Sequence, residues 1–138
     1  MKKSIASVVL TVSLVIGQGL PAHAALKSRR FETPSGNIRC HLQGSGALRC
    51  DVGSGLKPEP KKECELDWTG LLLSRRHRAR PNCAGDTVPS TKKVLDYGEK
   101  WTRAGRVCVS KRSGLHCWNR NDYHFKVSRD SWRRWHAA

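Results

Sequence analysis

Acidic residues are scarce in this sequence: eleven Asp and Glu stand against twenty-six Lys and Arg, a formal net charge of +15 at pH 7. So large an excess of positive charge produces a surface potential that attracts polyanions. It therefore predicts a partner such as nucleic acid, an anionic lipid surface or an acidic polysaccharide. The alternative is that the charge does no more than keep a basic exported protein soluble.

The chain also lacks the motifs of several enzyme classes. It has no Gly-x-Ser-x-Gly nucleophile elbow, no phosphate-binding loop and no spaced pair of acids of the kind that glycosidases use. It has neither the Cys-x-x-Cys nor the His-x-x-x-His spacing of a zinc site, so we expect no metal and no cofactor. No long apolar segment follows residue 24, so we expect no transmembrane segment.

What is present begins with the pattern of an export signal. Lys2 and Lys3 precede a mostly apolar stretch over residues 5–20, and Pro-Ala-His-Ala at 21–24 places small residues where a signal peptidase cuts. We expect cleavage after residue 24. The remaining residues 25–138 would form one exported domain, periplasmic or secreted, and loss of the two leader lysines lowers its formal charge to +13.

Six cysteines lie in the exported part, and an even number in a small exported chain predicts a disulfide framework rather than a metal site. They are Cys40, Cys50, Cys64, Cys83, Cys108 and Cys117. Six cysteines permit fifteen pairings, so their number alone does not define the connectivity.

The first two cysteines have the pattern of a stapled hairpin. If Cys40 faces Cys50, Gly-Ser-Gly at 44–46 becomes the loop, and alternation places their apolar neighbours on one face. That face carries Ile38, Cys40 and Leu42 opposite Val52, Cys50 and Leu48. The other face is mostly polar, with Arg39 across from Asp51. Turn, pattern and disulfide agree, so we expect a hairpin here.

A similar arrangement returns at Cys108 and Cys117, where direct pairing leaves Arg112-Ser113 as a two-residue loop. Such loops prefer glycine or asparagine at positive φ, whereas the glycine here is Gly114. A bulge at Gly114 would suit the turn but would shift the register by one residue. The repeat favours a Cys108–Cys117 pair, and Cys64–Cys83 then follows by elimination.

Short strand-like runs separated by turn signals continue through the rest of the chain and predict an all-β domain. They cover residues 62–67, 71–74, 94–97, 106–110, 115–118 and 123–128. Between them, the arginine-rich residues 74–80 are expected to form an exposed loop or edge strand. At the end, residues 128–138 are expected to form a short helix capped by Ser128, in which Trp132 and Trp135 share a face.

Several of these stretches together resemble a family of small secreted bacterial proteins of unknown function, marked by a TPSGNI-x-C opening and six cysteines. They are FETPSGNIRC, LRCDV, CELDW, CAGDTV, VLDYG, CVSKRSGLHCWN and FKVSR, which follow one another between residues 31 and 129. Where family members often have His-Gly-Phe, this chain has Tyr123-His124-Phe125, so Tyr123 takes the place of the family histidine. The resemblance implies a shared domain and supplies no reaction.

A non-catalytic module that binds an anionic polymer or an anionic membrane surface is the function that these patterns favour. Arginines and flat indole rings are the groups that release counterions from a polyanion and contact its units. The candidate anion-binding residues are Arg75, Arg76, Arg78, Arg80, Trp132, Arg133, Arg134 and Trp135. An alternative for the tail is that its two tryptophans pack on the sheet while the arginines face water.

Two other functions remain open at this point. A ribonuclease-like hydrolase would use two imidazoles as acid and base, and His41 and His116 lie on the predicted hairpins. His77, His124 and His136 are the other histidines of the exported part. Asp86, in Gly-Asp-Thr, is expected to cap its own turn. The third possibility is an inhibitor or adaptor that binds a protein partner through an exposed loop.

Overall fold

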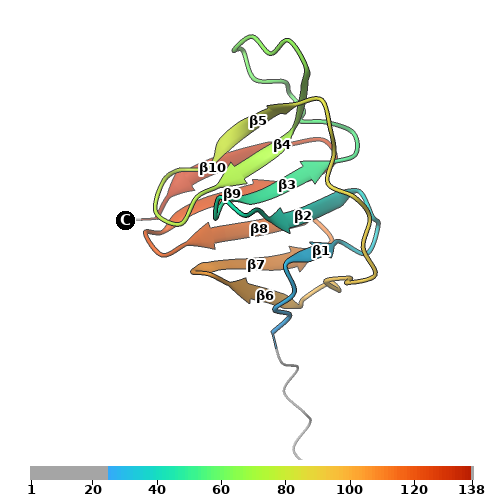
Figure 1. The fold of residues 1–138 in the computed structure, drawn as a ribbon, viewed down its shortest axis with the longest axis vertical. Helices are drawn as coiled ribbons and strands as arrows, with labels where there is room; N and C mark the ends of the chain where they lie inside the picture. Colours follow the sequence, from blue (N-terminus) through green and yellow to red (C-terminus); the bar gives the residue numbers. More distant parts are fainter. Residues whose placement is uncertain (1–24, 138) are drawn as a thin grey trace, which may run out of the picture.

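The computed structural model describes residues 25–137, so the predicted export signal at residues 1–24 lies outside the described residues. The described chain forms two antiparallel five-stranded sheets (Figure 1). The first contains β1 (Arg30–Glu32), β2 (Ile38–Leu42), β3 (Leu48–Val52), β4 (Asp67–Leu73) and β5 (Arg80–Ala84). The second contains β6 (Lys100–Arg103), β7 (Arg106–Lys111), β8 (Gly114–Asn119), β9 (Tyr123–Val127) and β10 (Trp132–His136).

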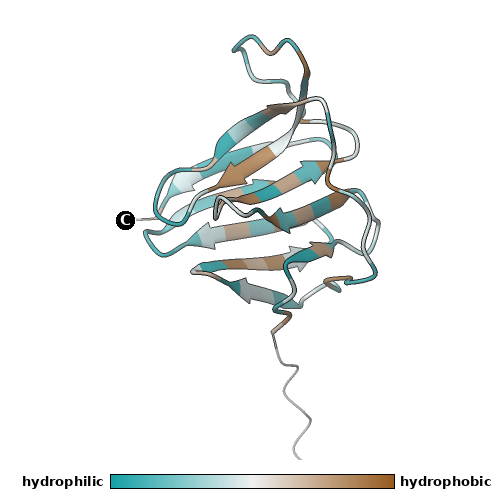
Figure 2. Cartoon of the chain, viewed as in Figure 1, coloured by the Kyte–Doolittle hydropathy of each residue, from teal (hydrophilic) through white to brown (hydrophobic). Residues whose placement is uncertain are grey.

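Each sheet is a meander in which every strand pairs with the next one along the chain. Alternation along the strands turns the apolar side chains of both sheets to one shared core, as the alternating colours of β2 and β3 show (Figure 2). Phe31 of β1 and Trp101 of β6 are both fully buried there, with ring centroids 5.0 Å apart.

The two sheets have equivalent registers. In the first, Phe31 pairs with Cys40, Cys40 with Cys50, and Cys50 with Leu71. In the second, the corresponding row is Trp101, Cys108, Cys117 and Phe125. The similarity predicted for the two cysteine hairpins therefore extends to two five-stranded halves of the molecule, β1–β5 and β6–β10.

Three disulfides form, Cys40–Cys50, Cys64–Cys83 and Cys108–Cys117, which are the pairs that the sequence favours. In the second hairpin Cys108 lies directly opposite Cys117 and Lys111 opposite Gly114, so no bulge shifts the register. Gly114 itself has a φ of 127°, and a Cβ there would lie 2.4 Å from the Val127 carbonyl oxygen. The glycine is required by the approach of the neighbouring strand.

The predicted C-terminal helix is wrong, because residues 132–136 form strand β10 instead. Ser128 does not cap a helix: its backbone N–H donates to the Ser131 carbonyl at 2.8 Å and closes the turn between β9 and β10. In a strand Trp132 and Trp135 point to opposite faces, so they do not share one. The described residues contain no helix, and so none long and apolar enough to cross a membrane.

Two of the shorter strand predictions also differ from the structure. Residues 62–66 are irregular, and β4 begins only at Asp67, after the Pro-Glu-Pro segment. Val94 makes an isolated bridge with Glu32 rather than belonging to a strand. Residues 62–66 are mostly exposed and polar, which leaves little to hold them in a sheet. In the second segment Leu95 is fully buried in the core although it does not belong to a strand.

Candidate binding face on the second sheet

The outer face of the second sheet is built from the residues that alternate with its core positions. The strand registers align them in two rows across the sheet. One row consists of Lys100, Val109, His116, Lys126 and Arg133. The other consists of Thr102, Val107, Trp118, His124 and Trp135. We call these two rows the outer face.

Rings from three adjacent strands stack on one another at the centre of this face. The centroid of the His124 ring lies 5.2 Å from that of Trp135 and 5.8 Å from that of Trp118, at interplanar angles of 16° and 19°. His116 lies 5.2 Å from Trp135 and 5.1 Å from Trp118. On Trp135 the Arg133 guanidinium sits 4.7 Å from the ring centroid. The rings are partly exposed and hold one another in place.

The two histidines are hydrogen-bonded to each other, with 2.9 Å between His116 Nε2 and His124 Nδ1. Burial lowers the pKa of His116 below its usual value, and the charges of His124, Lys111, Lys126 and Arg133 lower it further. Burial also lowers the pKa of His124, against a smaller opposing effect of Asp122. Both shifts favour the neutral imidazoles, which suits a hydrogen bond that needs one N–H and one lone pair.

Positive charge surrounds this ring cluster without compensation in the sheet. None of the five strands β6–β10 contains an Asp or Glu. Lys126 Nζ donates to the Ser113 hydroxyl at 3.0 Å rather than to a carboxylate. Across all the described residues there are three ion pairs, and they involve Arg39 and Arg49 as the only cations. The outer face is thus cationic, with aromatic rings at its centre.

The equivalent face of the first sheet is closed at its centre. Arg49 and Asp51 occupy the positions of His116 and Trp118, and both are buried. The Arg49 guanidinium donates to both Asp51 oxygens at 2.9 and 2.8 Å, and to the Asp86 carboxylate at 3.1 Å. The Val88 N–H donates to Asp51 at 2.9 Å, which holds the segment after β5 over this face.

Gly70 completes the closure, since it occupies the position of His124. A Cβ there would lie 1.9 Å from the Cys50 carbonyl oxygen, so no side chain can stand at that point of the first sheet. Asp86, expected to cap its own turn, instead binds Arg49 through its carboxylate and its carbonyl. Of the two equivalent faces, the first is covered at its centre, where Arg49 is paired with two carboxylates, while Arg30, Arg39 and Arg80 remain accessible towards its edges. The centre of the second face is open, and its strands contain no carboxylate.

The structure separates the predicted anion-binding residues into three places. Arg75, Arg76 and Arg78 lie in the exposed loop between β4 and β5, which Asn119 anchors through bonds from its amide to the Ser74 and His77 carbonyls at 3.1 and 2.9 Å. A second group, Arg80, Trp132 and Arg134, lines a pocket of about 550 Å³ together with Trp68 and three prolines. Only Arg133 and Trp135 belong to the outer face.

The histidines predicted for a hydrolase are not brought together. His41 lies on the outer side of β2 and His116 on the outer side of β8, so they belong to opposite faces of the molecule. His77 lies in the arginine-rich loop, and His136 stacks on Tyr123 with centroids 4.5 Å apart. Within the described part of the chain, no group of three or more His, Cys, Asp or Glu is placed to hold a metal ion.

The contacts of His116 and Trp118 with His124 were not predicted from the sequence. The family-like motif favoured a core position for Trp118, but this residue is half-buried on the outer side of β8. The alternation within residues 114–119 and 123–127 agrees with that placement. What it did not show was that the strands pair in a register that puts Trp118 opposite His124. The available signal was the short turn at 120–122, which makes antiparallel pairing of the two strands the expected arrangement.

Comparison with known proteins assigns the chain to a family. A family model described as a family of unknown function, DUF6636, matches residues 10–134. The chain belongs to DUF6636. Membership agrees with the resemblance noted from the sequence motifs, and the three disulfides are consistent with it. No curated protein and no solved structure matches the chain. DUF6636 therefore supplies a family and no reaction, and the function has to be argued from the outer face.

Proposed function

We propose that this protein is an exported, non-catalytic module that binds a linear anionic polymer on the outer face of the β6–β10 sheet. The observation that carries the proposal is the difference between the two equivalent faces. At the centre of the first face, Arg49 is paired with Asp51, and the segment that contains Val88 covers them. The second keeps two tryptophans and a row of cations partly exposed. The three disulfides are consistent with export.

A polymer fits this face better than a membrane does. Insertion into a bilayer needs protruding apolar side chains. Within residues 25–137 the exposed large hydrophobic residues are Leu66, Val94 and Tyr97, which all lie away from the outer face. A polyanion needs regularly spaced cations, and the row that holds Lys126 and Arg133 runs across the strands.

Recognition of the polymer should depend on its charge and not on bases. One face of Trp135 carries the Arg133 guanidinium, and the His124 and His116 rings stack on it as well. A nucleobase would have to displace one of these groups to stack. We therefore expect a sulfated or carboxylated polysaccharide to bind at least as well as single-stranded nucleic acid of similar charge density.

The test is a titration of the oxidised protein, purified after export of the full chain, with dextran sulfate and tryptophan emission as the readout. Neutral dextran is the matched control ligand, and single-stranded DNA and anionic vesicles are the comparison ligands. With the three cations of the outer face in contact, raising the salt from about 50 to 200 mM should weaken binding roughly twenty- to fortyfold. Dextran should cause no shift.

Matched variants locate the binding site. Lys126→Gln with Arg133→Gln should lower the affinity for dextran sulfate about tenfold or more and reduce the salt dependence by roughly two-thirds. Lys92→Gln with Lys93→Gln removes the same charge from an exposed segment outside the second sheet, and should have little effect. Equal effects of the two double variants would reduce the interaction to net charge and overturn the proposal.

Other results of these titrations would favour one of the alternative functions. Binding to vesicles but not to dextran sulfate would replace the polymer by a membrane. Cleavage of RNA in the same mixtures, lost in His116→Gln, would replace the binding module by a hydrolase. A shift with none of these ligands would contradict the proposal and favour a protein partner, whose binding should depend less steeply on salt.

A further inference from the structure

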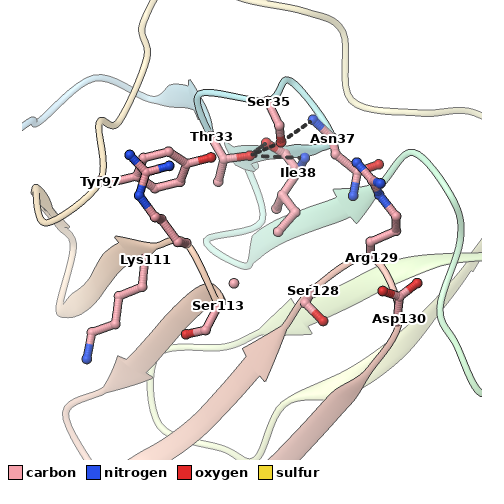
Figure 3. Close-up of a pocket in the computed structure, with 12 residues that line it drawn as sticks. Thr33, Ser35, Asn37, Ile38, Tyr97, Lys111, Ser113, Ser128, Arg129 and Asp130 are labelled. Atoms are coloured by element: carbon pink, nitrogen blue, oxygen red, sulfur yellow. Dashed lines mark hydrogen bonds between the residues drawn. The ribbon is translucent and has the colours of Figure 1, made fainter.

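A cleft of about 380 Å³ lies where four connections of the chain meet, away from the ring cluster of the outer face. One wall is the loop between β1 and β2, with Thr33, Ser35 and Asn37 (Figure 3). The opposite wall consists of the turns β7–β8 and β9–β10, and Tyr97 lies at one end of the cleft. In this view the Lys111 side chain points away from the hollow.

The walls of the cleft are held by hydrogen bonds within each loop. The Thr33 N–H donates to the Ile38 carbonyl at 2.9 Å, and the Asn37 N–H donates to the Ser35 hydroxyl at 3.3 Å. On the other side the Ser128 N–H donates to the Ser131 carbonyl at 2.8 Å. Close packing of Gly114 on Val127 keeps the two turns together. The cleft is therefore formed before any ligand arrives, which lowers the entropic cost of binding.

Two guanidinium groups and several hydroxyls line this cleft. The Arg112 guanidinium lies 4.7 Å from the centroid of the Tyr97 ring, and Arg129 stands at the far end beside Asn37 (Figure 3). Neither arginine forms an ion pair within the described residues. Asp130 is the only carboxylate among the lining residues. The site thus offers cationic hydrogen-bond donors, neutral polar groups and one negatively charged hydrogen-bond acceptor.

We infer that this cleft binds a sugar that carries a carboxylate, such as a uronic acid. A guanidinium matches a carboxylate through two parallel N–H bonds, and hydroxyl and amide side chains exchange hydrogen bonds with sugar hydroxyls. The volume falls in the range of small-molecule sites. Asp130 favours this ligand over a phosphate, because its negative charge repels a dianion more than a monoanion while its oxygens accept bonds from hydroxyls.

This inference goes beyond the polymer-binding proposal and does not depend on it. The test is an NMR titration of the ¹⁵N-labelled, oxidised protein, again purified after export of the full chain. Galacturonate is the probe, galactose supplies the hydroxyls without the charge, and inorganic phosphate supplies the charge without the sugar. Galacturonate should shift the amide signals of Asn37, Ser113 and Ser128 at millimolar concentrations. Galactose and phosphate should each bind more weakly.

Arg129→Gln should weaken galacturonate binding about tenfold or more, because it removes a charge-assisted bond. Arg78→Gln removes the same charge from the exposed β4–β5 loop and should leave the affinity unchanged. Arg133→Gln, on the outer face, should also leave it unchanged, which separates this site from the polymer site. Dispersed spectra of all three variants confirm that they fold.

The inference is overturned if galactose binds as tightly as galacturonate, or if phosphate binds more tightly. It is equally overturned if no amide in the cleft shifts at tens of millimolar galacturonate, or if Arg78→Gln weakens binding as much as Arg129→Gln. Failure of dextran sulfate to bind, with galacturonate still binding, would contradict the polymer proposal alone.

Discussion

Single residues determine which face of this molecule is open. Asp51 is 4 % exposed and its carboxylate accepts bonds from Arg49, from the Thr69 hydroxyl at 3.1 Å and from the Val88 N–H at 2.9 Å. Asp86 reaches the same arginine from a largely exposed position. Because Asp51 accepts four hydrogen bonds and Asp86 is close to water, the two acids should contribute very differently to stability.

Asp51→Asn should lower the free energy of unfolding by about 3 kcal/mol, since it leaves the buried Arg49 guanidinium without its main counter-charge. Asp86→Asn should cost about 1 kcal/mol or less. Urea unfolding of the oxidised protein, with both variants at one pH, measures the difference. Similar losses for the two variants would show that Asp51 does not hold the face closed. Arg49→Met with Asp51→Leu should recover part of the loss.

The lowered pKa values of His116 and His124 predict how the stability of the protein depends on pH. Burial lowers the pKa of His116 from its usual value of 6.5, and the charges of His124, Lys111, Lys126 and Arg133 lower it further. Burial lowers the pKa of His124 in the same direction. With lowered pKa values in the folded state, the unfolded chain binds protons first as the pH falls. The folded state is therefore favoured above pH 6.5 and loses stability as the pH falls below it.

We expect the free energy of unfolding to decrease from pH 7.5 to pH 5, a range in which carboxylates stay largely ionised. His116→Gln with His124→Gln should flatten that dependence. A remainder should persist because burial, with Arg30, Arg29 and Arg49, also lowers the pKa of His41. Urea midpoints at a series of pH values measure the slope. The exposed His77→Gln variant is the control, and a double variant with the wild-type slope would contradict the assignment.

At the scale of elements, β10 shows how a strand edge overrides a local pattern. Trp-Arg-Arg-Trp, at the spacing of a helix face, follows a serine that suits a helix cap. In the folded protein β9 offers an unpaired edge, and residues 132–136 pair with it along their whole length. Trp132 then turns inward, packs against the core and donates from Nε1 to the Pro58 carbonyl at 2.8 Å.

The opposite orientations of the two tail tryptophans can be tested directly. Trp132→Ala should lower the free energy of unfolding by about 2–4 kcal/mol, because it removes packing from the edge of the core. Trp135→Ala should cost only about 1 kcal/mol, the value of its aromatic contacts, while weakening dextran sulfate binding. Urea unfolding and the polymer titration on both variants give the two readouts. A helix-like tail would make the two substitutions equivalent, and that result would contradict the strand.

The predictable elements are those whose evidence is local. The Cys40–Cys50 hairpin has turn, alternation and cysteines within fifteen residues, and its predicted register is the observed one, with Ile38 opposite Val52 and Leu42 opposite Leu48. For the Cys108–Cys117 hairpin, the sequence left open only whether Gly114 forms a bulge that shifts the register. By contrast, β10 and the outer face depend on pairing between β8, β9 and β10, and the cleft depends on loops more than sixty residues apart. The short turn at 120–122 indicates the pairing of β8 with β9, but no local pattern indicates that β10 joins them or that these loops meet.

At the scale of the whole molecule, two equivalent halves share one core and differ in what they show to solvent. Cys40–Cys50 and Cys108–Cys117 staple the central hairpin of each half, and all four cysteines are fully buried. Cys64–Cys83 instead joins the irregular segment before β4 to the outer strand β5, and Cys83 is exposed. The three disulfides therefore differ in loop length and in burial, and these two properties predict opposite rankings of their contributions.

Loop length alone would make Cys64–Cys83 the most stabilising, because it closes 19 residues against 10 and 9. In the chain-entropy model this difference is only about 0.5 kcal/mol, on a contribution of about 3 kcal/mol per disulfide. Burial has the larger effect, since replacing two buried cysteines by alanine also loses their sulfur contacts and leaves a cavity. We therefore expect removal of either core pair to cost about 1–2 kcal/mol more than removal of Cys64–Cys83.

The measurement is urea unfolding of three double Cys→Ala variants, each with its two other disulfides verified by mass. The two core variants should lie close together, because the halves are equivalent in register, and both should be less stable than the Cys64→Ala, Cys83→Ala variant. If that variant proves the least stable, loop entropy rather than core packing governs stability. A wide gap between the two core variants would instead show that the halves, although alike in register, do not contribute equally to the shared core.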